Sequence, residues 1–366
     1  MNRIPVAIVG LGRIASLLED DSRREKPCTH AGAVTANKDC VLAAGCDTDE
    51  ERRRLFAVRW QAPVYADALR MLREHKPEIL IIATHPDSHE RYCRLAYTQG
   101  TPVLICEKPL SNTLAGARKI AALTQGRGGS GPSGRALPSP LRILVNHERR
   151  YAADYMRAAE ILRTRRLGPL LSVRAVLYMG RARPLIDVLW HDGTHLADAI
   201  MFLAGAVLRH KGRWGSPLGS KEGTAYLEGL LYPAAGPEGE KQSSPVPCLI
   251  EAGAWRDHLV FEMEFSCGRG RLRIGNGVYE VWESAECPYA EGFRSLARSP
   301  DRFRGSTGYF ANMLADAAAC VRDSGRQPRS AAADGLRVIE YLNAVKIGKP
   351  ENPAPSPAGN ATSRVN

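Results

Sequence analysis

The chain has 366 residues, of which 44% are hydrophobic and 24% charged, and its formal net charge is +11. This composition is typical of a globular protein with room for two domains, and no apolar run approaches the ~20 residues that a membrane-spanning helix needs. The basic residues are spread along the chain without an interleaved block of aromatics, so we interpret the charge as a solvated surface rather than a nucleic-acid site.

The cysteines and the first residues of the chain indicate the cellular compartment of the protein. There are nine cysteines, an odd number, and no Cys-x-x-Cys occurs, so neither a disulfide framework nor a structural zinc site is predicted. Free thiols fit a reducing cytoplasm. No basic leader precedes the first apolar run, so we expect no secretion signal.

The first motif is a glycine turn. The apolar run Pro5–Val9 predicts a buried parallel strand, and the chain continues as Gly10-Leu11-Gly12-Arg13-Ile14-Ala15. In a Gly-x-Gly-x-x-Ala turn the first glycine permits a tight bend and the second lets the backbone approach a pyrophosphate. The N–H groups at the start of the next helix, expected from Ile14, favour the same anion. The context therefore predicts a dinucleotide site, with a ligand-free glycine turn as the alternative.

An acidic residue ends the second predicted strand. Val41–Cys46 is apolar and is followed by Asp47, where a carboxylate accepts hydrogen bonds from a ribose hydroxyl and repels a 2′-phosphate. Asp47 thus favours NAD, with NADP as the alternative. It lies further from the glycines than the usual ~20 residues, which we attribute to an extra loop around residues 19–27. A surface aspartate before the predicted helix Glu50–Val58 is the other interpretation.

Polar residues follow three further predicted strands, at 78–84, 103–106 and 141–145. Ligands of open parallel sheets bind beyond the carboxyl ends of the strands, so these residues should border the cofactor. The first group is Thr84 with the loop His85-Pro86-Asp87-Ser88-His89, the second is Glu107, Lys108 and Pro109, and the third runs from Asn146 to Tyr151. A lysine at the carboxyl end of such a strand, here Lys108, would lie beside the nicotinamide. Pro109 would fix the backbone next to it, through a cis peptide bond if the Lys108–Pro109 bond is cis. Helices are expected at 65–74, 91–99 and 114–123.

The pattern changes in the second half. Alternating apolar and polar residues predict an antiparallel sheet with one open face, at 170–178, 223–231, 249–255, 259–266, 270–274 and 277–282. Helices are expected at 155–166, 193–203, 309–323 and 331–347. The predicted fold is therefore an α/β Rossmann domain (1–146) followed by an α+β domain (147–349). Gly-, Ser- and Pro-rich stretches predict flexible insertions at 126–140 and 233–247 and a disordered tail at 350–366.

A polar cluster precedes one of these helices. Asp192 can cap the helix, His195 would lie on its first turn, and Asp198 on the same face could orient the imidazole. Oxidation of a carbinol needs a base for the hydroxyl proton, which a histidine near neutral pKa supplies, and Lys108 could stabilise alkoxide charge. A capping or surface histidine is the alternative. A metal cluster with His191 is another, but His191 precedes the expected helix start, so we predict no metal.

In order and spacing these residues resemble the glucose–fructose oxidoreductase/inositol dehydrogenase (Gfo/Idh/MocA) family. The most specific part is Glu107-Lys108-Pro109 with Gly193-x-His195 well downstream. The resemblance implies that Lys108 and His195 are the catalytic pair and that Glu107 and Pro109 shape the nicotinamide pocket. It also implies a homodimer or homotetramer formed through the C-terminal sheet.

The resemblance is less direct for the substrate residues. Many members have an Asp four residues before the His, where this chain has His191, and its aspartate is Asp192. We therefore expect His191 to bind substrate, keep Asp192 as a catalytic candidate, and place three further residues near the substrate entrance: His147, Arg149 and Arg150.

The expected function is hydride transfer between a nicotinamide cofactor and a carbinol or carbonyl carbon, and the resemblance implies that the substrate is a sugar, cyclitol or sugar derivative. Neither nucleic acid nor a membrane is expected as a partner. Two alternatives share the same motifs. One is a glycosidase that uses NAD transiently, and the other is a non-catalytic protein that senses NAD or a sugar on the same fold.

Overall fold

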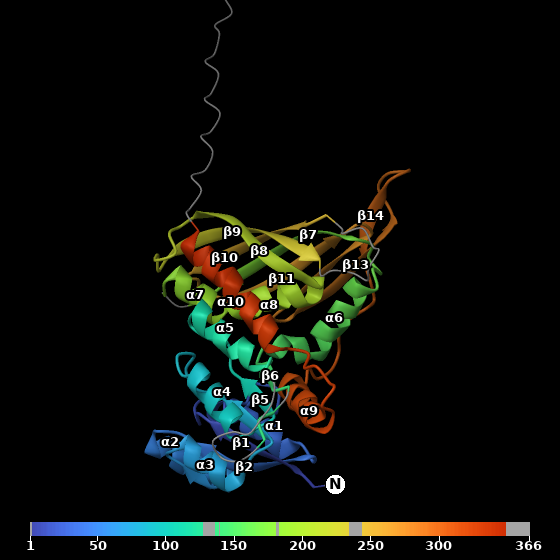
Figure 1. Cartoon of the computed structure of the whole chain (residues 1–366). Helices are drawn as coiled ribbons and strands as arrows, with labels where there is room; N and C mark the ends of the chain where they lie inside the picture. Colours follow the sequence, from blue (N-terminus) through green and yellow to red (C-terminus); the bar gives the residue numbers. More distant parts are fainter. Residues whose placement is uncertain (1, 127–135, 139, 181–182, 234–243, 349–366) are drawn as a thin grey trace, which may run out of the picture.

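Two β-sheets organise the molecule (Figure 1). The computed structural model describes residues 2–126, 136–138, 140–180, 183–233 and 244–348. The N-terminal half contains a six-stranded sheet, and the C-terminal half an eight-stranded one. This confirms the predicted fold class.

The first sheet is parallel in all its described pairs and has the order β3-β2-β1-β4-β5-β6. Its strands are β1 (Ile4–Val9), β2 (Cys40–Cys46), β3 (Val64–Tyr65), β4 (Ile79–Ile82), β5 (Val103–Cys106) and β6 (Arg142–Val145). Every residue of β4, β5 and β6 is buried, because helices cover both faces of the sheet. This is the Rossmann order, in which ligands bind where the strand order reverses, beside the carboxyl ends of β1 and β4.

Helices form a layer on each face of this sheet. One face packs against α1 (His30–Ala36), α2 (Glu50–Trp60) and α9 (Tyr309–Arg322). The other packs against α3 (Ala68–His75), α4 (His89–Thr98), α5 (Leu114–Leu123) and α10 (Ala332–Ile347). Asp49, Asp67 and Thr113 cap α2, α3 and α5 by accepting a backbone N–H in the first turn, which fixes where these helices begin.

The second sheet has the order β14-β13-β12-β11-β7-β10-β9-β8, and of its described pairs only β7–β10 is parallel. Its strands are β7 (Leu170–Tyr178), β8 (Ala206–Gly215), β9 (Gly223–Pro233), β10 (Val246–Ala254), β11 (Val260–Cys267), β12 (Gly270–Gly275), β13 (Val278–Glu286) and β14 (Arg294–Arg298). One face packs against α6 (Ala153–Arg163), α8 (Gly193–Ala204) and α10. The other carries charged pairs such as Arg273 with Glu262.

The structure corrects the sequence-based elements in several places. Strands β3, β8 and β14 and helices α1 and α7 (Leu185–His191) were not expected. The expected helix at Ile14 is a turn followed by a short 3-10 segment, η1 (Leu17–Asp20). Strand β8 is an edge strand rich in cationic residues and glycine. Such residues protect the sheet edge against pairing with another chain, and they also mask the alternation of apolar and polar residues that would predict a strand.

The domain boundaries stay a prediction, with one correction. Helix α9, which the sequence assigned to the second domain, buries Phe310, Met313 and Leu314 in the core beside β1 and β4. The predicted insertions and tail fall largely outside the described residues (127–135, 139, 234–243 and 349–366). Pro233 and Val246, at the borders of one predicted insertion, belong to strands β9 and β10.

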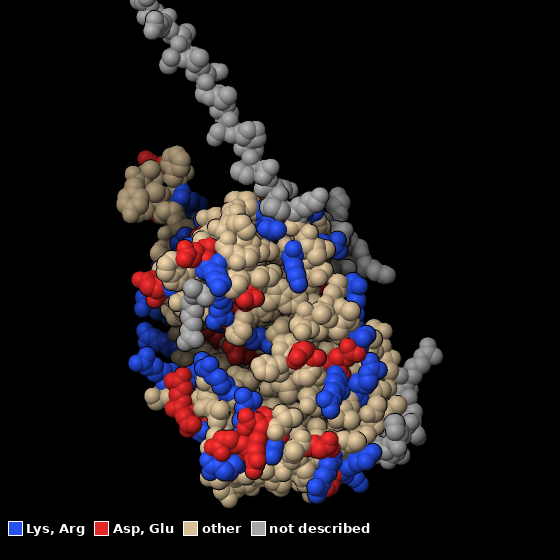
Figure 2. All heavy atoms as spheres, turned by 90° about the vertical axis from the view of Figure 1, so that its left-hand side faces the viewer, with Lys and Arg blue, Asp and Glu red and all other residues tan. Residues whose placement is uncertain are grey.

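Two properties concern the surface. None of the helices in the described part of the chain is long and apolar enough to cross a membrane. On the face drawn in Figure 2, cationic and anionic side chains are mixed, and a recess separates the lower, nucleotide-domain half from the upper half.

Candidate active site

The glycine turn connects β1 to η1 and opens onto a cavity. Gly10 has φ +88°, and a Cβ there would lie 2.6 Å from the Ala83 carbonyl oxygen, so only glycine fits. Gly12 differs, because a Cβ would meet nothing closer than Arg52 Nη1 at 3.8 Å. Protein packing therefore does not require a glycine at position 12, and the open space there fits a group that approaches the backbone closely.

The cavity has a volume of about 590 Å³ and lies beyond the carboxyl ends of β1, β2 and β4. Its lining includes these predicted residues: Gly10, Gly12, Arg13, Ile14, Asp47, Thr84, His85 and His191. It also includes Asp87 and Ser88 of the loop that was predicted to border the cofactor, and residues that sequence reasoning missed, among them Thr48, Arg52 and Tyr92. The switch-point rule could also have indicated Thr48, because it follows the end of β2.

Six other residues predicted to bind the cofactor are not part of this lining: Leu11, Pro86, His89, Glu107, Lys108 and Pro109. Leu11 is buried in the core, and its backbone N–H donates to Asp47 Oδ2 at 2.8 Å. The buried His89 ring lies within hydrogen-bond distance of the Thr84 and Leu110 carbonyl oxygens. Leu11 and His89 therefore act here as supports of the cavity wall.

Asp47 is held in place at the end of β2. Its Oδ2 accepts the Leu11 N–H, and its Oδ1 accepts the Asp49 N–H at 2.9 Å. A carboxylate has about four acceptor sites, so acceptors remain for ribose hydroxyls. Arg52 Nη1 lies 3.8 Å from Asp47 Oδ2 and, with Arg13, adds cations to the same cavity.

Lys108 reaches across the two halves of the molecule. It follows β5, its bond to Pro109 is cis, and its Nζ donates to the His191 carbonyl oxygen at 2.9 Å. His191 is the last residue of α7, and its exposed ring borders the cavity. The ammonium is thereby tied to the segment that leads into α8.

His195 lies on the first turn of α8, as predicted, and near Lys108. Burial lowers the pKa of its imidazole well below the ordinary value, and the charges of Lys108 and Arg149 lower it further. The His147 ring faces it edge-on, with the ring centroids 6.5 Å apart. His195 is therefore neutral at neutral pH, and one ring nitrogen has a free lone pair.

Asp192 lies between α7 and α8, but its side chain does not cap α8 as expected. Its Oδ1 lies 3.1 Å from His191 Nδ1, and its Oδ2 lies 3.8 Å from Arg183 Nη1. Burial alone would raise the pKa of Asp192, but the hydrogen bond from His191 and the nearby cations hold it below the ordinary value. Asp192 therefore stays anionic and orients His191.

Five buried polar atoms near Lys108 and His195 have no hydrogen-bond partner among the described residues. They are Asn146 Oδ1, both ring nitrogens of His147, Asp192 Oδ2 and His195 Nδ1. Buried polar atoms are normally paired, so this cluster fits a polar ligand between the two halves.

The two predicted substrate arginines have other partners. Arg150 Nε donates to both oxygens of Asp198, at 2.9 and 3.0 Å, and its Nη1 lies 3.2 Å from Asp334. The Arg149 guanidinium lies 3.8 Å above the Phe261 ring and donates to Asn276. Asp198, expected to orient His195, is instead the counter-ion of Arg150. These side chains join the helices around the site, and sequence spacing could not reveal pairs so far apart.

Metal binding was one alternative for the cluster around His195. Within the residues that the structure describes, no three side chains of His, Cys, Asp or Glu are grouped in a way that could hold a metal ion.

Comparisons with known proteins bear on the same region. Residues 4–130 match the model of the Gfo/Idh/MocA family, described as an oxidoreductase family with an NAD-binding Rossmann fold. This domain belongs to the Gfo/Idh/MocA family. The resemblance inferred from the glycine turn and the Glu-Lys-Pro motif is thus confirmed.

Relatives of this Gfo/Idh/MocA domain match only part of the chain. The uncharacterized oxidoreductase YhhX of Escherichia coli is 27% identical over 158 residues, which are 40% of this chain and 42% of YhhX. An inositol 2-dehydrogenase of Pseudomonas fluorescens is 35% identical over 92 residues, 24% of this chain and 27% of the enzyme. The matched stretches thus span less than half the length of each of these relatives.

The fold comparison covers nearly the whole chain. A crystal structure of an oxidoreductase domain protein from Kribbella flavida has a TM-score of 0.71 at 18% identity, covering 94% of this chain and 96% of that one. At this identity the likeness shows a shared fold. It extends the architecture beyond the Gfo/Idh/MocA domain to the eight-stranded sheet.

Proposed function

We propose that the protein is an NAD(P)-dependent oxidoreductase that moves a hydride between a nicotinamide cofactor and a carbinol or carbonyl carbon of a sugar, cyclitol or sugar derivative. The observation that carries the proposal is that Lys108 and His195, from different halves of the chain, lie near each other, and that Lys108 contacts His191, which lines the same cavity as the glycine turn. The family of residues 4–130 and the name of the inositol 2-dehydrogenase relative support the reaction and substrate class.

We assign this cavity to a dinucleotide. Gly10–Ile14 would hold the pyrophosphate, since Gly12 leaves its backbone open, and Asp47 would accept the ribose hydroxyls. The bound nicotinamide would supply a hydride acceptor or donor at C4. We propose NAD as the preferred cofactor because Asp47 is anionic at the ribose position. Arg13 and Arg52, which line the same cavity, support NADP as the alternative because a cation can pair with a 2′-phosphate.

His195 and Lys108 would share the proton and charge chemistry. In the oxidation direction the neutral His195 ring takes the hydroxyl proton, which its lowered pKa permits throughout the neutral range. The Lys108 ammonium donates to the same oxygen and stabilises the developing alkoxide. In reduction the two groups act in reverse, with His195 returning the proton.

Other polar groups would bind the substrate. His191 borders the cavity, Asp192 orients it, and His147 faces His195, so these three can bind hydroxyls next to the reacting carbon. Arg149 and Arg150, engaged with Asn276 and Asp198, are assigned to holding the site together.

The test is to measure NAD and NADP binding and then to screen polyols and sugars for formation of the reduced cofactor, with Lys108→Ala as the blank. Turnover of one compound class by the wild type alone supports the proposal. Binding of the cofactor without reduction by any compound would refute it. Cleavage of a glycoside without net reduction would instead identify the NAD-dependent glycosidase.

We also propose a homodimer or homotetramer formed through the open face of the eight-stranded sheet, in a reducing cytoplasm. Exposed apolar side chains on this domain support the assembly, including Leu171, Trp255 and Leu259, each more than half exposed. The nine cysteines are all free, which supports the compartment. Sedimentation at several protein concentrations tests the assembly.

A further inference from the structure

A buried contact connects the glycine turn to Lys108 through a histidine that the sequence did not single out. His30 is the first residue of α1, and its Nε2 lies 2.8 Å from Glu107 Oε1. The two side chains are only 1% and 9% exposed, and Glu107 immediately precedes Lys108. The pair therefore joins the start of α1 to the segment that carries the lysine.

The Glu107 carboxylate is the centre of this contact. Asn146 Nδ2 donates to the same Oε1 at 2.5 Å, and the Lys108 backbone N–H donates to Oε2 at 3.2 Å. Burial alone would raise the pKa of Glu107, but the hydrogen bond and charge of His30, followed by Asn146 and Lys108, hold it below the ordinary value. A buried carboxylate kept anionic by fixed donors holds its neighbours in one geometry.

His30 is itself fixed to the glycine turn. Its backbone N–H donates to the Ile14 carbonyl at 3.2 Å, and the next residue, Ala31, donates to the Ala15 carbonyl at 2.9 Å. The ring packs edge-on against Phe310 of α9, with centroids 5.2 Å apart. The position of the imidazole is thus set by the residues that would hold the pyrophosphate.

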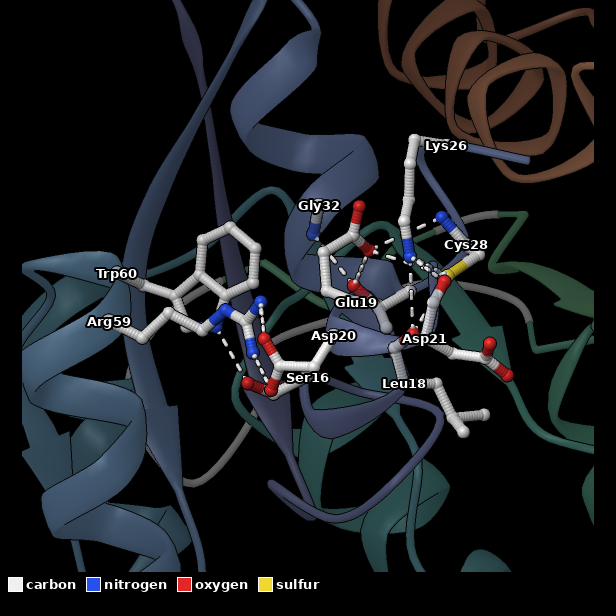
Figure 3. Close-up of polar contacts among 11 residues, drawn as sticks. Ser16, Leu18, Glu19, Asp20, Asp21, Lys26, Cys28, Gly32, Arg59 and Trp60 are labelled. Carbon is white, nitrogen blue, oxygen red and sulfur yellow. Dashed lines mark hydrogen bonds and ion pairs between the residues drawn. The ribbon is translucent and has the colours of Figure 1, made fainter. Parts of the chain in front are cut away.

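The loop before α1 holds the start of the helix (Figure 3). Glu19 Oε2 accepts from the Cys28 N–H at 3.2 Å and from Thr29 Oγ1 at 2.6 Å, and Thr29 in turn caps α1 by accepting the Gly32 N–H. A Cβ on Gly32 would lie 2.5 Å from Glu19 Oε2, so the carboxylate packs directly on the helix. The extra loop therefore closes on itself and presents His30 to Glu107.

We propose that His30 is a positioning residue. By donating to Glu107 it fixes the Glu107–Lys108 segment relative to the glycine turn, so that the Lys108 ammonium keeps a constant place with respect to the bound nicotinamide. This inference rests on the function proposed for Lys108.

Three variants test the role. His30→Leu removes the ring N–H while filling a similar volume, His30→Gln keeps an N–H donor, and Thr29→Ala removes the cap of the same helix without touching Glu107. Misplacement of a catalytic group by about 1 Å can cost up to ~100-fold in rate, so we expect kcat of His30→Leu to fall roughly 10- to 100-fold with NAD affinity unchanged. His30→Gln should recover most of kcat. Thr29→Ala should melt at a lower temperature but keep its kcat.

A second readout needs no substrate. Reductive methylation with ¹³C-formaldehyde labels the lysines, and the Lys108 signal is the one missing in Lys108→Arg. We expect this signal to shift or broaden in His30→Leu and to stay unchanged in Thr29→Ala. Glu107→Leu removes the acceptor of the same contact and must change the Lys108 signal in the same way. This variant replaces His30→Leu if His30→Leu does not fold.

The outcomes separate the two proposals. Unchanged kcat and an unchanged Lys108 signal in folded His30→Leu would overturn the positioning role. An equal loss of kcat in His30→Leu, His30→Gln and Thr29→Ala would reduce it to general destabilisation, which also overturns it. If the wild type turns over no sugar or polyol, the proposed function fails, and the Lys108 signal alone decides whether His30 positions the lysine.

Discussion

The Asp198–Arg150 pair allows a sharp test of which acidic residue matters to catalysis. We expect Asp198→Asn to destabilise the protein and leave kcat of the folded variant nearly unchanged. The pair is buried, with side chains 1% and 8% exposed, and Arg150 Nη2 lies 2.8 Å from Asp198 Oδ1. If Asp198 instead oriented His195, the same substitution would lower kcat with a smaller effect on stability.

The size of the expected loss of stability depends on the contacts that Arg150 keeps in Asp198→Asn. Removing one partner of a buried ion pair costs about 3–5 kcal/mol, because the other charge stays buried and unpaired. Arg150 retains Asp334 at 3.2 Å and the Arg329 carbonyl at 3.1 Å, so we expect the lower end, about 3 kcal/mol. At roughly 2–4 °C per kcal/mol for domains of this size, the melting temperature should fall by about 6–12 °C.

The assay is thermal and denaturant unfolding followed by circular dichroism, with steady-state kinetics on the same samples. Asp187→Asn is the matched control, because Asp187 is exposed on α7, and it should change neither property. A melting temperature within about 2 °C of the wild type, which is under ~1 kcal/mol, would refute the reasoning. So would a large loss of kcat in a variant of normal stability.

Four further predictions concern the cavity and the catalytic pair. Gly12→Ala should fold normally and lose NAD affinity tenfold or more. Gly10→Ala should also lower the stability of the protein, because only at position 10 would a Cβ clash with protein atoms. Calorimetric titration measures the affinity and melting curves the stability, and equal stability of the two variants would contradict this geometry. Asp47→Asn should narrow the preference for NAD over NADP, measured as the ratio of the two kcat/KM values, and an unchanged ratio would remove Asp47 from cofactor selection. Lys108→Ala should lower kcat by ~10²-fold or more with NAD binding intact, and unchanged turnover would exclude the lysine from the mechanism. The pKa of His195 in the folded protein is lowered from 6.5, so below about pH 6.5 the unfolded chain gains a proton that the folded protein does not. The stability of the protein should therefore decrease as the pH falls through this value, and it should decrease less steeply in His195→Asn. Equal slopes of stability against pH in the two proteins would contradict the lowered pKa.

Hydrophobic patterns within short stretches of sequence were sufficient to predict the buried strands of the first sheet. The buried strands β1, β4 and β5 are continuous apolar runs, and their prediction is confirmed within a residue or two. Strand β8 was missed because its side chains are chosen for an exposed edge, and α7 because it is only seven residues long.

The candidate site was predictable only where a motif marked it. Gly10, Gly12, Asp47 and Lys108 follow strand ends, which the topology brings to one edge of the sheet. The contact of His30 with Glu107 joins positions 77 residues apart, and no spacing rule reaches that far. For the same reason Arg150 looked like a substrate ligand, since its partner Asp198 becomes its neighbour only when the chain is folded.

One consequence comes from the bond between Lys108 and the carbonyl of His191. An ammonium group has three N–H bonds, and this contact occupies one of them. Two hydrogens are left for everything else that meets the lysine, so a substrate hydroxyl can be received without releasing the helix junction. Because this bond joins the N-terminal and C-terminal halves, a motion that separated the halves would break it and free the Lys108 side chain.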